Sequence, residues 1–369
     1  MCRISLISLM LLGSIYFSPS RSHASDDSES YDYLLVLPLQ YNYYQPPDPQ
    51  GLALGNRLDN ISGAAAAFGN PAKLAVPDRY QVMISAGYLS DGRSSPAVVT
   101  EGSSALPSTA AGMLKWKANN FAVGYRQAMK VGIIFPDMRD PEIIDRADLL
   151  LNQVAAAWSF SGIKNLWLGV CLTWTQFDFK WYGPTTELAA GRGSAPGFSA
   201  GLLADLGPGV YFSAGFKSKT EMSCITQFYG DSTDSELKMA GAIPQIGWMS
   251  FKYQPEPGLE ISAGMEMTGW HLISSGYLEQ MDYHLGCSLE LINNRLEAYL
   301  GSYSLKHPLD SYLRRYDPYL QNMYFITVGL GCRLGPVKLI CSAATSHPFS
   351  GKGLNQNLLS AGIVYQNYP

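Results

Sequence analysis

The sequence predicts an all-β protein: a transmembrane, antiparallel, up-and-down β-barrel of about 14 strands with a hatch or plug segment at its N-terminus. Three observations predict this fold. From residue 79 onward, short segments alternate polar and apolar residues with a period of two. The connections between these segments are long and short in turn. Only 15% of the residues are charged and 12% are aromatic, whereas soluble domains are typically about 25% charged.

The first part of the chain, residues 1–24, is predicted to be a secretory signal peptide. A basic start at Arg3 leads into an apolar run that is too short to span a bilayer comfortably. Ser22-His23-Ala24 then forms a small-x-small cleavage signal. We therefore expect the mature chain to leave the cytoplasm. The remainder divides into an N-terminal extension and hatch at 25–78 and a barrel at 79–369.

The N-terminal extension changes character along its length. Residues 31–50 contain prolines at positions 46, 47 and 49, and we expect no regular structure there because proline lacks a backbone N–H and restricts its neighbours. The following small-residue stretch, "SGAAAAFGNPAKLA" at 62–75, predicts a short helix and then a turn at Asn70-Pro71.

The barrel strands are predicted from the period-two segments. The gaps after odd-numbered segments are long and those after even-numbered segments are short, which is typical of a barrel with tight turns at one end and longer loops at the other. The predicted strands are 79–90, 107–117, 120–130, 148–161, 165–181, 195–206, 209–218, 242–254, 258–270, 281–292, 295–304, 322–333, 336–346 and 355–368.

The two faces of each predicted strand differ in the same sense. In "GLEISAGMEMTGW" at 258–270, every odd position from Leu259 to Met267 is apolar, whereas the even positions include Glu260 and Glu266. Carboxylates are costly in hydrocarbon, so we expect the apolar face to meet lipid and the charged face to line a polar interior. Six side chains are predicted to form a polar lumen set, either as a satisfied ion-pair cluster that stiffens the barrel or as a ligand-recognition site. They are Arg126, Glu260, Glu266, His284, Glu290 and Arg333.

One predicted strand changes phase. In 165–181 the apolar positions are even up to Trp174 and odd from Phe177 onward, which predicts a β-bulge at Thr175-Gln176 or a strand that emerges above the membrane there. Aromatic residues at segment ends predict interfacial girdles. These residues are Tyr88, Trp116, Trp181, Tyr253, Trp270, Tyr365 and Tyr368.

Other function classes find little support. A net charge of −4 with no basic patch argues against nucleic acid as a partner. The cysteines of the mature chain are odd in number without C-x-x-C spacing, and the histidines lack metal-binding spacing, so we expect neither a disulfide framework nor a metal or other cofactor. A G-x-S-x-G match at 197–201 lies inside a strand rather than at a strand-to-helix elbow. We therefore expect no catalytic residues and no enzyme activity.

The stretch at 62–75 resembles the hatch of the FadL-like family of outer-membrane long-chain fatty-acid and hydrophobic-compound transporters, in which a small-residue run leads into Asn-Pro-Ala-x-Leu-Ala before the first strand. Segments 213–230 and 243–270 also resemble that family, and the likeness covers roughly 60–369 in order. Lys73 departs from the family's usual glycine, and 31–50 has no counterpart. The resemblance implies a plugging or gating role for Phe68, Gly69, Asn70, Pro71, Ala72 and Leu74.

The resemblance implies passive uptake of a fatty-acid-like or hydrocarbon-like small molecule across a Gram-negative-type outer membrane, whose lipid surrounds the barrel. It also implies lateral release into the bilayer through a kinked third strand. In the third strand here, "NFAVGYRQAMK" at 120–130, the alternation fades at Gln127-Ala128, which predicts a gap. The alternative function is a non-conducting barrel that acts as a protein-binding scaffold or as a secretion or surface-attachment partner. A protein partner would then bind the predicted outer loops 219–241 and 305–321.

Overall fold

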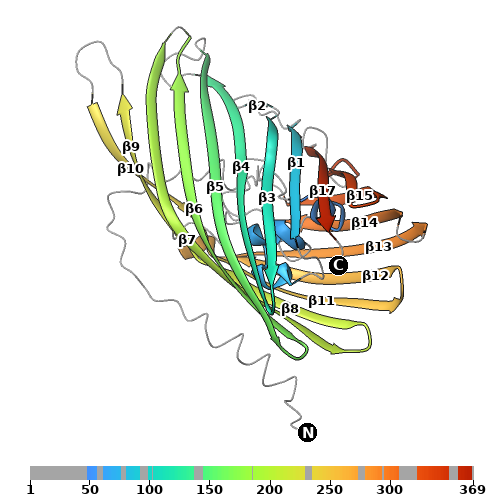
Figure 1. Ribbon diagram of the computed structural model, residues 1–369. Helices are drawn as coiled ribbons and strands as arrows, with labels where there is room; N and C mark the ends of the chain where they lie inside the picture. Colours follow the sequence, from blue (N-terminus) through green and yellow to red (C-terminus); the bar gives the residue numbers. More distant parts are fainter. Residues whose placement is uncertain are drawn as a thin grey trace.

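The computed structural model shows a closed antiparallel β-barrel of 14 strands with short helices inside it (Figure 1). Each strand pairs with its neighbour in the chain, and β1 pairs with β17 over twelve residues, from Tyr80↔Asn367 to Asp91↔Gln356, which closes the sheet. The predicted fold class and strand number are therefore confirmed. The structure describes residues 48–55, 61–75, 80–91, 99–101, 103–136, 144–184, 186–228, 235–272, 279–292, 295–306, 322–348 and 356–367. The predicted signal peptide lies outside these residues.

Three of the 14 strands are each made of two consecutive segments, which are β2 and β3, β8 and β9, and β10 and β11. The segments of the first half are β1 (Tyr80–Asp91), β2 (Val99–Glu101), β3 (Ser103–Trp116), β4 (Asn119–Pro136), β5 (Ile144–Ile163), β6 (Leu166–Tyr182), β7 (Glu187–Gly207), β8 (Val210–Lys217) and β9 (Thr220–Phe228). Those of the second half are β10 (Ser235–Ile243), β11 (Ile246–Glu256), β12 (Leu259–Thr268), β13 (Gln280–Ile292), β14 (Leu296–Leu305), β15 (Met323–Leu334), β16 (Val337–Thr345) and β17 (Gln356–Asn367).

The barrel has a short-turn end and a loop end, as the spacing predicts. Tight turns join β3 to β4, β5 to β6, β7 to β8, β11 to β12 and β15 to β16. Gly209, Gly258 and Gly335 have positive φ angles in these turns, a conformation that glycine adopts without steric cost. The opposite connections form the loop end, and several of them include residues outside the described chain.

Several strands are longer than predicted at the loop end. The predicted outer loop 219–241 is mostly strand, because β9 and β10 pair with each other from Phe228↔Ser235 to Thr220↔Ile243. β5 starts at Ile144 and β7 at Glu187, well before the predicted 148 and 195. The period-two apolar pattern ends before these strands do. A backbone ladder needs no apolar face to continue, so the pattern underestimates their length.

The predicted β-bulge at Thr175-Gln176 is wrong. β6 pairs with β5 and with β7 without interruption through this point, and its side chains keep alternating between the two faces. What changes is the chemistry of each face. Phe177 and Phe179 point inward and are buried, while Asp178 and Lys180 point outward. This reversal agrees with the second interpretation, a strand that extends beyond the hydrocarbon.

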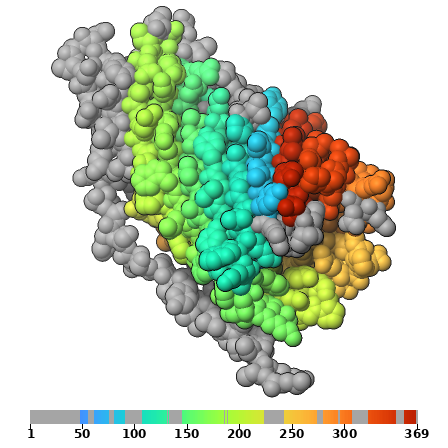
Figure 2. Space-filling model, in the orientation of Figure 1, coloured from blue at the N-terminus to red at the C-terminus, as the bar shows by residue number. Residues whose placement is uncertain are grey.

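The outer wall of the barrel carries an apolar band. Figure 2 shows the wall from β3 to β7 as one continuous surface. Val123 and Leu172, which lie on this wall, are each 66% exposed. Exposed apolar side chains recur on the outward face of every strand from β11 to β17. They include Ile261, Leu285 and Val328. A surface of this kind is what a membrane-spanning barrel presents to lipid.

The predicted aromatic girdles are only partly correct. Tyr88, Trp116, Tyr253 and Tyr365 are exposed on the outer wall. Trp181 and Trp270 point into the barrel instead, because each indole N–H bonds a buried polar side chain there. Tyr368 lies outside the described residues. Among the described helices, none has the length and apolar character needed to cross a bilayer.

The lipid-facing band can be tested on one strand face. We expect Leu172→Arg to lower the free energy of unfolding in lipid vesicles by about 2 to 4 kcal/mol, the cost of a cation near the bilayer midplane. Gln176→Arg, four residues further along the same outward face of β6, should cost no more than about 1 kcal/mol because that position lies in the polar stretch. Urea unfolding in vesicles measures both. Equal losses would contradict this assignment of the outer wall.

Candidate functional site

The first part of the site is a segment inside the barrel, which we name the lumenal segment: residues 48–55 and 61–75. It contains the helix α3 (Pro49–Ala53) and two short 3-10 helices, η2 (Gly63–Phe68) and η3 (Pro71–Leu74). α3 contacts β14 to β17, η2 contacts β1 and β3 to β5, and η3 contacts β4 to β7. The lumenal segment therefore contacts opposite parts of the inner wall of the barrel. Its helices are blue in Figure 1.

The helix α3 was not predicted, because the prolines of 31–50 were expected to prevent regular structure. Pro49 instead occupies the first turn, where a helix needs no donor from it. The Asp48 side chain caps this turn and accepts from the N–H groups of Gln50 (3.1 Å) and Gly51 (3.2 Å). Burial raises the pKa of Asp48 to about 6, although these two hydrogen bonds and the charge of Lys338 oppose the rise.

The predicted turn at Asn70-Pro71 is confirmed, and Asn70 is its central side chain. Asn70 is 0% exposed. Its Oδ1 accepts from the Ala72 N–H at 3.1 Å and so caps η3. Its Nδ2 donates to the Leu202 carbonyl at 3.2 Å and to Ser213 Oγ at 2.9 Å, both on the barrel wall. One amide thus shapes the turn and attaches it to β7 and β8.

The inner wall makes room for the lumenal segment by presenting glycine. A methyl group at Gly169 would overlap the backbone of Pro71 and Ala72, and one at Gly201 would overlap the Asn70 amide. The helices can approach the strands this closely only because the side chains are missing. The same close approach to the lumenal segment occurs at Gly124, Gly286, Gly301, Gly329 and Gly362.

Polar side chains from the opposite wall hold α3. Thr327 Oγ1 donates to the Ala53 carbonyl at 2.7 Å. Lys338 Nζ lies 2.9 Å from Glu297 Oε2 and 3.4 Å from Gln50 Oε1. Tyr299 OH donates to the same Glu297 oxygen. On the other side of the lumen, the Ala64 N–H donates to Gln81 Oε1 at 2.5 Å.

The second part of the site lies on the loop side of the lumenal segment. Inward apolar side chains from strands all around the barrel gather there, and Leu52 of α3 is the member that belongs to the lumenal segment. We name this group the apolar lumen cluster. Its buried members are Leu52, Leu89, Ala128, Met129, Ala147, Leu149, Leu151, Phe177, Phe179, Ala189, Ala195, Met222, Ile243, Trp270, Tyr303, Met323, Phe325, Ala344 and Leu358, with Trp181 and Leu305 packed against them.

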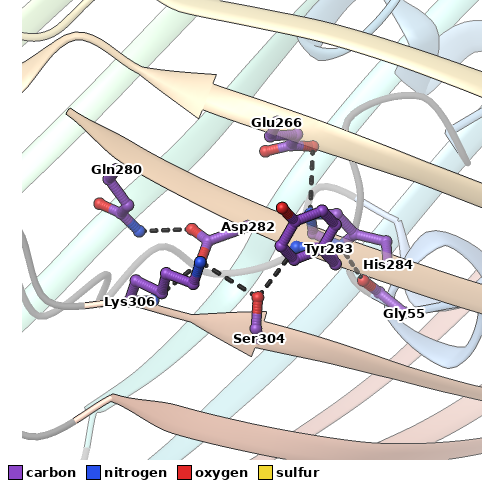
Figure 3. A network of polar contacts seen from close by, with 8 residues as sticks. All are labelled: Gly55, Glu266, Gln280, Asp282, Tyr283, His284, Ser304 and Lys306. Carbon is purple, nitrogen blue, oxygen red and sulfur yellow. Dashed lines mark hydrogen bonds and ion pairs between the residues drawn. The ribbon is translucent and has the colours of Figure 1, made fainter.

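A polar network flanks this cluster on β13 and β14 (Figure 3). Asp282 Oδ2 accepts from the Gln280 amide, whose oxygen accepts from Trp270 Nε1 at 2.6 Å. Asp282 Oδ1 accepts from the Lys306 N–H at 2.8 Å and from Ser304 Oγ at 3.3 Å. Both oxygens of this buried carboxylate are therefore occupied, which is the condition for burying such a group without a large penalty.

A stack of rings connects the cluster to the lumenal segment. Phe325 and Tyr303 stack with centroids 4.5 Å apart, and His284 follows Tyr303 at 6.1 Å. His284 Nδ1 lies 2.7 Å from the Gly55 carbonyl oxygen (Figure 3). Since a carbonyl only accepts, the ring proton is on Nδ1. His284 Nε2 lies 4.0 Å from Glu266 Oε1. The row of rings therefore runs from Phe325 in the apolar lumen cluster to the Gly55 carbonyl of the lumenal segment.

The six predicted lumen residues lie at different heights along the barrel. His284 and Glu266 lie together beside Gly55, and buried Arg126 lies over the Phe68 ring at 5.9 Å. Glu260 pairs with Lys252 at 3.1 Å. The remaining two, Glu290 beside the Gly258 turn and Arg333 near Glu297, lie toward the short-turn end with Glu260. All six lie on the inward-facing positions of their strands, and strand position separates them along the barrel axis.

Sequence reasoning missed the apolar lumen cluster and its two tryptophans. Inward apolar residues contradict the simple rule of lipid outside and polar residues inside, so Phe177 and Phe179 were interpreted as a phase slip. The signal was the reversal itself: when outward positions turn polar and inward positions turn aromatic, the strand has left the hydrocarbon and its inner face has become a candidate binding surface.

The wall between β3 and β4 is interrupted. The β3 ladder with β4 ends at Thr109↔Arg126, and pairing to β4 resumes only with β2 at Glu101↔Gly132. Between these points β3 pairs with β1 only at Ser103–Ala105, after a register shift between Ser85 and Gly87. On its other side, β4 shifts register against β5 between Gln127 and Met129, which places a bulge at Ala128. The fading alternation of the sequence at Gln127-Ala128 therefore coincides with an irregularity of the strand.

The described residues also include histidines, acids, cysteines and a serine that could carry metal, thiol or serine chemistry. Within the part of the chain that the structure describes, no group of three or more His, Cys, Asp or Glu side chains could hold a metal ion. Cys171, Cys287, Cys332 and Cys341 are free thiols. Ser199, in the G-x-S-x-G match, is buried in the middle of β7 rather than at an elbow.

The fit of the lumenal segment to the wall can be tested with one methyl group. We expect Gly169→Ala to displace η3 and to speed amide exchange across residues 63–75, because overpacking costs about 1 to 3 kcal/mol and three short helices resist displacement less than the barrel does. Gly112→Ala is the matched control on β3, where a methyl group meets nothing within 4 Å. Hydrogen exchange with mass spectrometry measures both variants. Unchanged exchange in Gly169→Ala would contradict the close fit.

A scan of protein-family models and a search of curated protein sequences each find no match to this chain. Solved structures do match. A FadL homologue from Pseudomonas aeruginosa superposes with a TM-score of 0.65 and 14% identity, over 87% of this chain and 99% of that chain. The P. putida toluene transporter TodX gives 0.62 and 12%, over 89% and 99%. The Ralstonia pickettii toluene transporter TbuX gives 0.61 and 13%, over 89% and 99%.

At these identities the likeness is one of fold, and it spans nearly the whole length of each solved chain. It agrees with the closed 14-stranded wall and the segment inside it. The chain therefore has the FadL-like barrel fold.

Proposed function

We propose that this protein is a passive outer-membrane transporter for hydrophobic small molecules. The observation that carries the proposal is the apolar lumen cluster: aromatic and aliphatic side chains from strands all around the barrel converge on the loop side of a docked lumenal segment. A FadL-like barrel fold by itself is compatible with many functions. A closed barrel whose interior is apolar at the loop end and polar near the short turns favours an apolar solute.

The physical advantage of such a cluster is that the solute never has to be released into water. Each Å² of apolar surface removed from water contributes about 25 cal/mol, so even a small aromatic ring gains several kcal/mol on binding among these side chains. Met129, Met222 and Met323 within the cluster are adaptable in shape. The solute can therefore be held without a rigid, single-ligand fit.

The lumenal segment acts as the hatch in this proposal. Its gating residues are Phe68, Gly69, Asn70, Pro71, Ala72 and Leu74, which lie in and between η2 and η3. Support comes from the way they are held: close van der Waals contact with glycines and the Asn70 bonds to Leu202 and Ser213. In this proposal the segment moves as a unit while the closed ladder of the barrel stays intact.

The exit in this proposal is lateral, through the interrupted wall between β3 and β4. Among the described residues, β4 residues 127–131 have no β3 ladder partner, so a solute that passes between β3 and β4 there crosses a gap in the ladder. Ala128 and Met129 belong to the apolar lumen cluster and lie at this point of β4. The cluster and the interruption are thus continuous along one strand.

The proposal includes the outer membrane as location, because the apolar outer band requires lipid. It also includes residues 1–24 as the secretory signal, because of their basic start, apolar run and cleavage signal. It also holds that the protein is not an enzyme. The alternative, a protein-binding scaffold, draws on loops whose tips at 229–234 and 307–321 lie outside the described residues, whereas the apolar lumen cluster gives transport a specific structural basis.

Transport through the apolar lumen cluster can be tested by removing one of its rings. We expect Phe325→Ala to weaken binding of radiolabelled toluene to the protein in nanodiscs about 5- to 50-fold, since it removes a buried ring from the cluster. Phe251→Ala, on the lipid-facing side of β11, is the control and should bind normally. Protein-free nanodiscs supply the background. If toluene binds neither wild type nor variants above that background, the proposed function is wrong.

The lateral exit can be tested by removing the bulge. Deletion of Ala128 should restore the β4–β5 register and extend the ladder, and we expect uptake of a radiolabelled hydrocarbon into cells with the protein in their outer membrane to fall toward that of cells without it. Toluene binding in nanodiscs should persist, which separates a closed exit from a lost binding site. Uptake at the wild-type rate by the deletion variant would contradict the lateral route.

A further inference from the structure

A buried carboxylate lies beside the apolar lumen cluster at the loop end of β5. Asp145 is 1% exposed. Its Oδ2 accepts from Trp181 Nε1 at 2.9 Å. Its Oδ1 is fully buried and has no hydrogen-bond partner among the described residues. Trp181 packs against the apolar lumen cluster, and Ala147, the next inward residue of β5, is a member of it. The unused oxygen is therefore next to the proposed binding site.

The neighbouring acids show that this arrangement is particular to Asp145. Asp148 points outward from the same strand and pairs with Arg146 at 2.8 Å. Asp282, the other buried carboxylate near the cluster, has both oxygens occupied by Gln280, Ser304 and the Lys306 backbone. Only Asp145, of these three, buries an oxygen without a donor.

A buried acceptor without a donor costs about 1 to 3 kcal/mol, and more when it is charged. The cost is removed when a ligand supplies the donor. An ionised carboxylate accepts hydrogen bonds and attracts positive charge, and it repels a second carboxylate. The chemistry beside the cluster thus suits a molecule with an apolar body and a donor group such as an ammonium or a hydroxyl. It disfavours a molecule whose polar end is an anion.

We propose that Asp145 Oδ1 binds the hydrogen-bond donor of an amphipathic ligand, an apolar amine or alcohol, whose apolar body lies in the apolar lumen cluster. The inference rests on the proposed function and narrows its substrate class. Trp181 holds the carboxylate in place through Oδ2 and leaves Oδ1 for the ligand. The ligand enters from the loop end, where Asp145 lies, and its body meets Phe177 and Phe179 on the neighbouring strand.

The test uses four probes that share one ring: toluene, benzyl alcohol, benzylamine and benzoate. We expect Asp145→Leu to weaken benzylamine binding about 10- to 100-fold and benzyl alcohol binding about 3- to 10-fold, because charge-assisted hydrogen bonds are the stronger ones. Toluene should bind as to wild type within about twofold, because it has no donor. Benzoate should bind wild type more weakly than toluene and gain affinity in the variant. Binding is measured in nanodiscs against protein-free discs.

Two further variants keep the result interpretable. Asp145→Asn retains an acceptor for Trp181 and the shape of the side chain, so it should stay folded and lose most of the benzylamine affinity while it keeps part of the benzyl alcohol affinity. Asp148→Asn, which faces outward on the same strand, should leave the binding of all four probes unchanged.

The outcomes separate this inference from the proposed function. If toluene binds but both Asp145 variants bind benzylamine and benzyl alcohol as tightly as wild type, the inference is wrong and the proposed function stands. If benzylamine binds in an Asp145-dependent way while toluene does not bind, the site is supported and the broader hydrocarbon proposal fails. If none of the four probes binds wild type, both are overturned.

Discussion

Closure of the backbone hydrogen-bond ladder is the constraint on which the rest of this structure depends. Hydrocarbon offers no partner for an exposed N–H or C=O group, so a sheet that spans it must pair every strand on both sides. The twelve-residue register between β1 and β17 meets this requirement. Once the sheet is closed, each strand has one face toward lipid and one toward a lumen, and the period-two sequence pattern follows from that division. The interruption between β3 and β4 is therefore a departure from this rule, and the proposed lateral exit lies there.

Glycines on the inner wall determine where the lumenal segment lies as much as the larger side chains do. Glycines on strands from β4 to β17 let three short helices lie directly against the backbone of the wall. The polar contacts that hold these helices are specific, such as Asn70 to Ser213 and His284 to Gly55. The stack from Phe325 through Tyr303 to His284 connects the lumenal segment to the side chains above it.

The apolar lumen cluster and the acids beside it set opposing demands. Aromatic and aliphatic side chains favour solutes that avoid water, whereas buried carboxylates are stable only when their oxygens are satisfied. Asp282 meets this condition within the protein through its own strand and its neighbour. Asp145 meets it for one oxygen only. This difference between two otherwise similar residues is what points to a donor on the ligand rather than to a purely structural role for Asp145.

The sequence by itself determined the fold class, the strand number and the alternation of short turns and long loops. These are local properties, because side-chain alternation and turn composition are written into neighbouring residues. Strand ends and the inward turn of Trp181 and Trp270 were decided by tertiary structure. The strand ends depend on pairs such as Phe228 with Ser235. Trp181 turns inward to Asp145 and Trp270 to Gln280, which are distant in sequence or fixed only by the folded wall. The apolar lumen cluster, in turn, exists only because the closed sheet brings together residues from Leu52 to Leu358 that no pattern along the chain connects.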